Sequence, residues 1–451
     1  MATYLTRTPS SGSHGTTWTI SFWFKNTCSN EANEQYIYMG GDNTTTNNLW
    51  IRLQGTDRTL YLRNRSGGVN NTLLITNRKF RDTSAWYHIV YVFDGSNATE
   101  GDRVRLYVNG VRETSFSSET YPSQGTGFYI GATGDSMDIG RRTDGSGYND
   151  MNLLLAHYHI IDGTAYNADT FGSTDSTTGI WKPKTAPSVT YGTNGFFLKF
   201  ENSASMGTDS SGNSNNFTVN GTMTQTIDTP SNVFATLNFL DNYYSGFSFS
   251  NGNNTVALDN ISERYVMGNL GVSSGKWYWE GKLVSSSGFT YSKIGIEGSE
   301  MKNTTNGYQA DSYGYRGENG GKKVNNGTFT NWGDSYTNGD IIGVAVDLDN
   351  NNIYFSKNGT WQESGDPTSG SSGTGAAFSL TTPSTGFYYP AIGKEDADTC
   401  TWSFNFGNGY FGTTAVSSAQ NPDDGIGIFE YDVPAGYRAL CTKSINAQEY
   451  D

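Results

Sequence analysis

Residues 339–361, GDIIGVAVDLDNNNIYFSKNGTW, contain the pattern of two successive antiparallel hairpins. Apolar residues occupy alternate positions over 342–348 and again over 353–355, which is the period of a β-strand with one buried face. The runs are separated by Asp349-Asn350-Asn351 and end at Asn358-Gly359, and these residue types tolerate the left-handed backbone of a tight turn. This stretch therefore predicts sheet.

A similar hairpin pattern lies far upstream, where Val104, Leu106 and Val108 alternate with polar residues before Asn109-Gly110. Further strand candidates occupy residues 18–25, 49–53, 59–63, 86–93, 128–131, 153–161 and 196–200, with Gly, Asn, Asp or Ser clusters between them. Many short strands joined by turn residues are typical of a sandwich. Two hairpins so far apart indicate two β-domains.

Composition supports a turn-rich sheet protein. The chain has 451 residues with 56 glycines, 14% aromatic and 16% charged residues, so it exceeds one ordinary core and needs no disulfide staples. Cys28, Cys400 and Cys441 are odd in number and widely spaced, which predicts ordinary reduced thiols. A net charge of −14 argues against nucleic acid as a partner.

The N-terminus, MATYLTRTPSSGSHGTTWTISFWF, lacks the features of a secretory signal, and no apolar run approaches the ~20 residues of a membrane span. We therefore expect a protein made in a cytoplasm, without membrane insertion, that would reach the outside of a cell only as part of a particle such as a virion.

The alternation stops around residues 228–232, where proline enters. We therefore expect an all-β chain of two β-sandwich (jelly-roll) domains in tandem. The expected divisions are residues 1–222, a connecting segment over 223–253, residues 254–412, and a short C-terminal docking tail over 413–451. The tail contains enough apolar residues to dock rather than to extend into solvent.

Three segments of the first block, WTISFWFK (18–25), WYHIVYVFDG (86–95) and RVRLYVNGVR (103–112), resemble the concanavalin A-like, laminin G type sandwich. That resemblance implies a fold that often binds glycans and sometimes calcium. The second block resembles a SPRY domain through GKWYWEGKL (275–283), KIGIEGS (293–299), the opening hairpins, FYYPAIG (387–393) and SFNFG (403–407). SPRY domains bind partners through loops.

The combination also resembles virion proteins of marine bacteriophages, through IDTPSNVFATLN (227–238) and DVPAGYRALCTKSIN (432–446). The resemblance implies a tail fibre, an appendage or a head decoration component. Its implied partners are other virion proteins and a host surface glycan, and we expect a homo-oligomer.

Catalysis on a jelly roll would need paired carboxylates, and the ExDxxE run typical of such enzymes is absent from the sequence. His157 and His159 would share one face of a strand, but no third metal ligand is close to them in the sequence. We therefore expect a protein that is not an enzyme and has no catalytic residues. A depolymerase whose carboxylates come from separate strands stays open.

The ligand-binding candidates combine aromatic rings with polar neighbours, as glycan sites do, against the alternative that the rings fill the cores. The candidates are Asp144, Tyr148 and Asp150 in the first block and Tyr313, Tyr315 and Trp332 in the second. No cofactor is certain, but Asp209, Asn213 and Asn215 offer oxygen ligands suited to calcium. Their alternative reading is a turn whose side chains cap its own backbone.

The function that these patterns favour is a non-enzymatic virion protein, located in the virion, whose loops bind a glycan or receptor for host attachment. The alternative is a head decoration or adaptor protein that binds other virion proteins.

Overall fold

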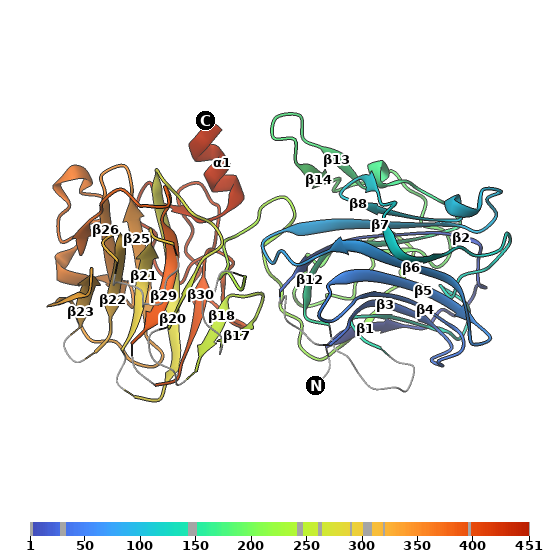
Figure 1. The fold of residues 1–451 in the computed structure, drawn as a ribbon, viewed down its shortest axis with the longest axis horizontal. Helices are drawn as coiled ribbons and strands as arrows, with labels where there is room; N and C mark the ends of the chain where they lie inside the picture. Colours follow the sequence, from blue (N-terminus) through green and yellow to red (C-terminus); the bar gives the residue numbers. More distant parts are fainter. Residues whose placement is uncertain are drawn as a thin grey trace. The chain divides into compact units, whose positions relative to one another are not determined.

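A computed structural model describes residues 3–27, 33–142, 151–240, 247–259, 264–288, 291–300, 309–318, 321–395 and 398–450. The chain divides into two compact units, Met1–Gln225 and Thr226–Asp451, drawn in blue to green and in yellow to red in Figure 1. Each unit is built from sheets, which confirms the predicted all-β class with two sandwiches.

In the first unit, the two main sheets pack face to face. One has the strand order β10 (Phe116–Thr120), β6 (Val69–Lys79), β5 (Thr59–Ser66), β4 (Asn48–Leu53), β3 (Gln35–Gly41), β11 (Ser136–Ile139), β1 (Tyr4–Arg7), β16 (Thr218–Asn220). The other has the order β15 (Phe196–Leu198), β12 (Leu153–Asp162), β2 (Thr17–Asn26), β7 (Trp86–Asp94), β8 (Val104–Val108), β9 (Val111–Arg112).

The core of the first unit lies between these sheets. Phe22 of β2, Ile51 of β4, Leu62 of β5 and Ile89 of β7 belong to one buried hydrophobic cluster. Successive side chains of a strand point to opposite faces, so the alternation in the sequence places these residues inward. Burying side chains of this size contributes roughly 1.5–3 kcal/mol each.

A short ribbon of β13 (Gly172–Thr174) and β14 (Trp181–Pro183) contacts the outer face of the second sheet. The Trp181 indole Nε1–H donates to Nδ1 of His88 at 3.0 Å. Gly110 has φ +82° in the turn between β8 and β9, and an added Cβ there would lie 2.6 Å from the Trp181 ring. Glycine is therefore required by both the turn and the packing.

In the second unit, one sheet contains the path β17 (Phe247–Ser250), β18 (Thr255–Leu258), β30 (Cys400–Asn405), β20 (Lys276–Ser286), β25 (Ile341–Asp347), β26 (Asn352–Lys357), β27 (Thr360–Trp361), with β28 (Phe378–Ser379) beside β26 and β33 (Arg438–Ala439) beside β20. The facing sheet has the order β19 (Arg264–Met267), β29 (Tyr389–Lys394), β21 (Ser292–Glu297), β22 (Ser312–Arg316), β23 (Lys322–Asn325), β24 (Thr328–Asn331).

Residues 339–361 form the two predicted hairpins, because β25 pairs with β26 and β26 pairs with β27. Asn351 and Asn358 adopt φ values of 58° and 49°, so asparagine supplies the left-handed residues that these turns need. Ile342, Val344 and Val346 face the core of the unit.

The chain after residue 412 packs against the outer face of β20, β25 and β26. Phe429, Tyr437 and Ala439 form a buried cluster there with Tyr278 and Ala345. The ribbon β31 (Tyr410–Phe411) and β32 (Thr414–Ala415) precedes this segment, and α1 (Thr442–Tyr450) follows it. Among the described residues, no helix is long and apolar enough to cross a membrane.

Residues 128–131, which the sequence predicts as a strand, form an irregular loop. Phe128 and Ile130 are buried in the core, which explains their apolar character. The Asn64 side chain makes hydrogen bonds to the backbone of this loop. It accepts from Tyr129 N at 3.1 Å and donates to Gly127 O at 3.3 Å, so these backbone groups are satisfied without pairing to another strand.

Candidate functional site

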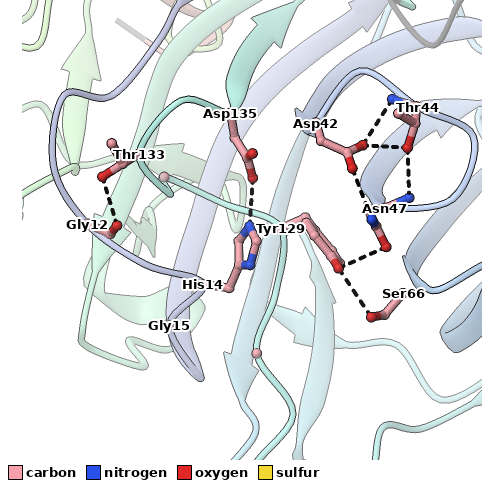
Figure 2. Close-up of polar contacts among 12 residues, drawn as sticks. Gly12, His14, Gly15, Asp42, Thr44, Asn47, Ser66, Tyr129, Thr133 and Asp135 are labelled. Atoms are coloured by element: carbon pink, nitrogen blue, oxygen red, sulfur yellow. Dashed lines mark hydrogen bonds and ion pairs between the residues drawn. The ribbon is translucent and has the colours of Figure 1, made fainter.

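Loops of the first unit bring together a polar cluster around His14 and Tyr129 (Figure 2). His14 comes from the loop between β1 and β2, and Tyr129 and Asp135 come from the loop between β10 and β11. His14 Nε2 lies 2.6 Å from Asp135 Oδ2. The rings of His14 and Tyr129 are 4.2 Å apart between centroids. The His14 side chain remains 37% exposed.

The turn between β3 and β4 completes this cluster. The Tyr129 hydroxyl donates to Asn47 Oδ1 at 3.1 Å, and it lies 3.2 Å from Ser66 Oγ. Asn47 Nδ2 donates to Asp42 Oδ2 at 2.9 Å. Partial burial raises the pKa of Asp42, but hydrogen bonds from Thr44 and Asn47 outweigh it, and the net pKa is lowered.

The cluster suits binding better than catalysis. Within the described part of the chain, Ser66 contacts Tyr129 and not His14, so His14 and Asp135 have no hydroxyl nucleophile in hydrogen-bond contact. What the cluster offers is an aromatic ring, an imidazole and amide and carboxylate groups at one place, which can hold a polar ligand. The sequence did not indicate this site, because His14 and Asp135 lie 121 residues apart.

Asp144, Tyr148 and Asp150 lie outside the described residues. Tyr313, Tyr315 and Trp332 are core residues of the second unit, with 2%, 0% and 8% of their surface exposed. Tyr315 packs edge-on against Trp332 at 5.3 Å between ring centroids. Their ring faces are therefore occupied by neighbouring core residues.

The calcium candidates form an internally bonded turn. Both carboxylate oxygens of Asp209 accept hydrogen bonds. The donors are Phe197 N, Ser211 N, Ser211 Oγ and Asn215 N, at 2.8–2.9 Å. Asn213 Nδ2 donates to Gly192 O and Gly195 O at 2.7 and 2.9 Å, and Asn215 Nδ2 donates to Gly195 O at 2.8 Å. These bonds match the turn that caps its own backbone.

Three histidines of the first unit, His88, His157 and His159, lie on the outer face of the sheet that contains β2, β7 and β12. His159 stacks on Phe197 at 3.9 Å, and its Nδ1 lies 2.9 Å from the Tyr191 hydroxyl. Burial lowers the pKa of His157 and, to a greater extent, that of His159. Among the described residues no group of three or more His, Cys, Asp or Glu side chains could hold a metal ion.

Two buried glutamates of the second unit were not singled out from the sequence. The Glu280 carboxylate accepts from Tyr278 Oη and Asn405 Nδ2, at 3.1 and 3.2 Å, and from the backbone N–H groups of Glu430 and Tyr431, at 2.9 Å each. Burial raises the pKa of Glu280 to about 7. The signal for this residue is an acid within the otherwise aromatic run WYWE.

Glu297 of β21 is equally buried, and it accepts from Ser312 Oγ at 2.7 Å and from Ser299 N at 3.3 Å. Burial raises its pKa to about 7 as well. Both carboxylates are occupied by internal donors, so each stabilises a local arrangement of the chain and neither is presented to a ligand.

A small, shallow hollow of about 20 Å³ lies where the loop between β19 and β20 meets α1. Its apolar lining consists of Val272, Trp277, Phe387 and Ile445. Trp277 is held in place because its Nε1–H donates to Ser274 O at 2.7 Å. Phe387 stands at the edge with 44% of its surface exposed, which is unusual for a large aromatic side chain.

The fold defines a protein of two β-sandwich units, and the surfaces described above are formed by their loops. Comparison with known families gives the type of each unit. A model for the concanavalin A-like lectin/glucanases superfamily matches residues 2–146, and a SPRY domain model matches residues 276–409. The chain therefore contains a concanavalin A-like, laminin G type domain followed by a SPRY domain.

Curated relatives match over short stretches. Ran-binding protein 9 of Danio rerio is 36% identical over 86 residues, which is 19% of this chain and 14% of that protein. The human Ran-binding protein 9 is 37% identical over 86 residues, 19% of this chain and 12% of that protein. A probable ATP-dependent RNA helicase of Dictyostelium discoideum is 31% identical over 138 residues, 31% of this chain and 15% of that protein.

Solved structures are similar at low identity. The SPRY domain of human HERC1 is 18% identical with a TM-score of 0.29, and the match covers 37% of this chain and 96% of that one. The PSpry domain of TRIM65 is 14% identical with a TM-score of 0.29, over 38% of this chain and 91% of that one. Neither likeness bears on function.

The predicted function in a bacteriophage virion is wrong. The relatives that match the chain include Ran-binding proteins 9 and 10 of eukaryotes, which do not support a place in a bacteriophage virion. The roles tied to a virion, namely a fibre for host attachment, a head decoration protein or adaptor and a virion depolymerase, fall with it. The virion resemblance rested on two short segments, 227–238 and 432–446, which pack in the second unit around the contact of Phe234 with Cys441.

Proposed function

We propose that this chain is a non-enzymatic interaction protein whose second unit binds a protein partner. The single observation that carries the proposal is the exposed Phe387 beside the apolar hollow of Val272, Trp277 and Ile445, in the unit that contains the SPRY domain. Two of the relatives described above are named Ran-binding protein 9, which supports protein binding as the class of function.

The hollow has the composition of an interface centre. Aromatic side chains dominate binding energy at protein interfaces when they are surrounded by residues that exclude water. Phe387 supplies the aromatic ring, while Ser273 and Gln448 supply a polar edge. Covering a side chain of this kind contributes roughly 1.5–3 kcal/mol, enough to make Phe387 a main determinant of affinity.

Charge gives the kind of partner. Residues 226–451 contain 24 Asp and Glu against 12 Lys and Arg, a net charge of −12, whereas the first 225 residues are close to neutral with 19 against 17. The long-range field of the second unit therefore attracts a basic partner, and salt weakens that attraction. We expect a partner with Lys or Arg around an apolar anchor.

The two buried carboxylates of the second unit take no part in the proposed binding surface, because Glu280 and Glu297 are satisfied by hydrogen bonds within the unit.

Site-specific crosslinking tests the proposal. The photoreactive analogue benzoylphenylalanine is placed at Phe387, and at Val284 in a matched control protein, because Val284 is an apolar residue of the same unit with 47% exposure. In extracts of the source cells, the Phe387 position is expected to crosslink a discrete basic protein that the Val284 position does not. Equal crosslinking from both positions, or none from Phe387, would contradict the proposed surface.

A further inference from the structure

The outer face of β3, β4 and β5 carries an array of arginines and aromatic rings that no part of the proposed function uses. Strand register places Tyr36 opposite Arg52 and Arg52 opposite Tyr61, and in the next row Trp50 opposite Arg63. With Arg142 these residues form what we call the arginine–aromatic patch.

Guanidinium groups of the patch stack on its rings. The Arg63 guanidinium carbon lies 3.4 Å from the Trp50 ring centroid, and that of Arg142 lies 4.8 Å from it. The Arg52 guanidinium carbon lies 4.1 Å from the Tyr61 ring centroid. Stacking on an aromatic face holds each guanidinium group in place over its ring.

The Arg63 guanidinium has no carboxylate partner among the described residues, whereas that of Arg52 has one. Arg52 forms an ion pair with Glu34. Arg63 donates from Nη2 to the neutral amide Oδ1 of Asn48 at 2.7 Å, and the nearby Arg65 donates to the carbonyls of Gly68 and Thr45. Burial lowers the pKa of Arg63, and the neighbouring charges of Arg65 and Arg52 lower it further.

Hydrogen-bond donors of the patch are buried without acceptors. Among the described residues, Trp50 Nε1, Arg52 Nε and Arg63 Nε have no hydrogen-bond partner, although only 5% of Trp50 and 8% of Arg63 is exposed. Leaving a buried donor without an acceptor is costly. Three such N–H groups on one face, two of them on guanidinium groups, therefore point to an acceptor that the described part of the chain does not supply.

We propose that the arginine–aromatic patch binds an oxyanion, which accepts from the Trp50 indole N–H and the Arg63 and Arg52 Nε–H groups. An oxyanion has several acceptor atoms for these N–H groups, and its negative charge is opposite to that of the guanidinium groups. A carboxylate group of a bound molecule and an inorganic sulfate or phosphate share this chemistry, and the test separates them.

The test follows the Trp50 indole N–H resonance in the intact chain. Trp50→Phe assigns the resonance by its loss, and the protein is then titrated with sodium sulfate, phosphate or acetate at constant ionic strength set with sodium chloride. The resonance is expected to shift with a saturable dependence on at least one oxyanion. Saturation by acetate identifies a carboxylate site, whereas saturation by sulfate or phosphate alone identifies a tetrahedral anion. No shift with any of the three would overturn the proposal.

Variants tie the binding to the patch. Arg63→Gln is expected to weaken binding about tenfold or more, as loss of a charge-assisted hydrogen bond does. Arg112→Gln is the matched control, because Arg112 belongs to the other sheet and pairs with Asp102 at 2.8 Å, and it should bind as the unaltered chain does. Trp50→Phe keeps a ring for stacking but removes one donor, so calorimetry should show weaker binding even if Arg63→Gln fails to fold. Unchanged affinity in both patch variants would contradict the site.

Discussion

His88 shows how one residue makes the first unit sensitive to acid. Its imidazole is 1% exposed, and its Nδ1 accepts the Trp181 indole N–H, so Nε2 carries the proton and donates to Ser21 Oγ at 2.9 Å. If Nδ1 were also protonated, its N–H would point at the Trp181 N–H, and the hydrogen bond between them would be lost. Burial, with a smaller effect of the charge of His157, lowers the pKa of His88 to about 3.

The sign of the resulting pH dependence follows from linkage. Below the ordinary pKa of histidine, about 6.5, the unfolded chain binds a proton that folded His88 refuses. The free energy of unfolding therefore falls as pH drops from 6.5 towards 3, by up to about 1.4 kcal/mol per pH unit from this group.

His88→Gln should remove this contribution. Hydrogen exchange of the β7 peptide in the intact chain, measured between pH 6.5 and 4.5 and corrected for intrinsic exchange, should show a smaller loss of protection with acid in the variant. An identical pH slope in both proteins would show that His88 does not titrate as described.

For single residues, the sequence predicted which side chains have the chemistry of a binding site, but not whether they are buried. Tyr313, Tyr315 and Trp332 had the composition of a binding site, but they lie in the core because long-range packing decides which aromatic rings are covered. The sequence left two alternatives for Asp209, a ligand of an ion or a residue that caps backbone N–H groups. The structure shows the capping bonds, because Phe197 N and Asn215 N donate to its carboxylate.

At the scale of elements, the hairpins were predictable because their signals are local. Alternation over β25 and left-handed asparagines at the turns lie within a few residues of each other. The apolar residues of the tail predicted that it docks, but not which face it covers, because Tyr278, Ala345 and Tyr354 lie far in the sequence from residues 429–441, which cover them.

Glu280 is one of the residues that connect this segment to the sheet, together with the pairing of β33 with β20. Its carboxylate accepts the N–H groups of both Glu430 and Tyr431, in addition to bonds from Tyr278 and Asn405. A glutamine at this position offers one acceptor oxygen and turns an amide donor towards the second N–H.

Glu280→Gln should therefore loosen the covering segment without unfolding the sheet. Leaving one buried N–H unsatisfied costs about 1–3 kcal/mol, so hydrogen exchange of a peptide over residues 428–437 should accelerate by about tenfold or more. Exchange of β25, which does not contact the carboxylate by hydrogen bonds, is the internal control. Unchanged exchange over 428–437 would show that Glu280 does not hold the segment.

At the scale of the whole molecule, the sequence indicated the class of each sandwich but not the surfaces that act. Motifs such as WTISFWFK and GKWYWEGKL are core strands, so they report the fold. The hollow near Phe387 joins the β19–β20 loop, the residues before β29 and α1, and no single segment carries its pattern. For the same reason, the virion resemblance of two short segments did not predict function.

The most direct measurement of the central claim is the affinity of the purified chain for the protein captured at Phe387, determined by calorimetry for the unaltered chain, Phe387→Asp and Val284→Asp. The account predicts that Phe387→Asp weakens binding about tenfold or more, as expected for an aromatic residue at the centre of an interface, while Val284→Asp binds like the unaltered chain. Equal affinity of Phe387→Asp and the unaltered chain would contradict the second unit's hollow as the binding surface.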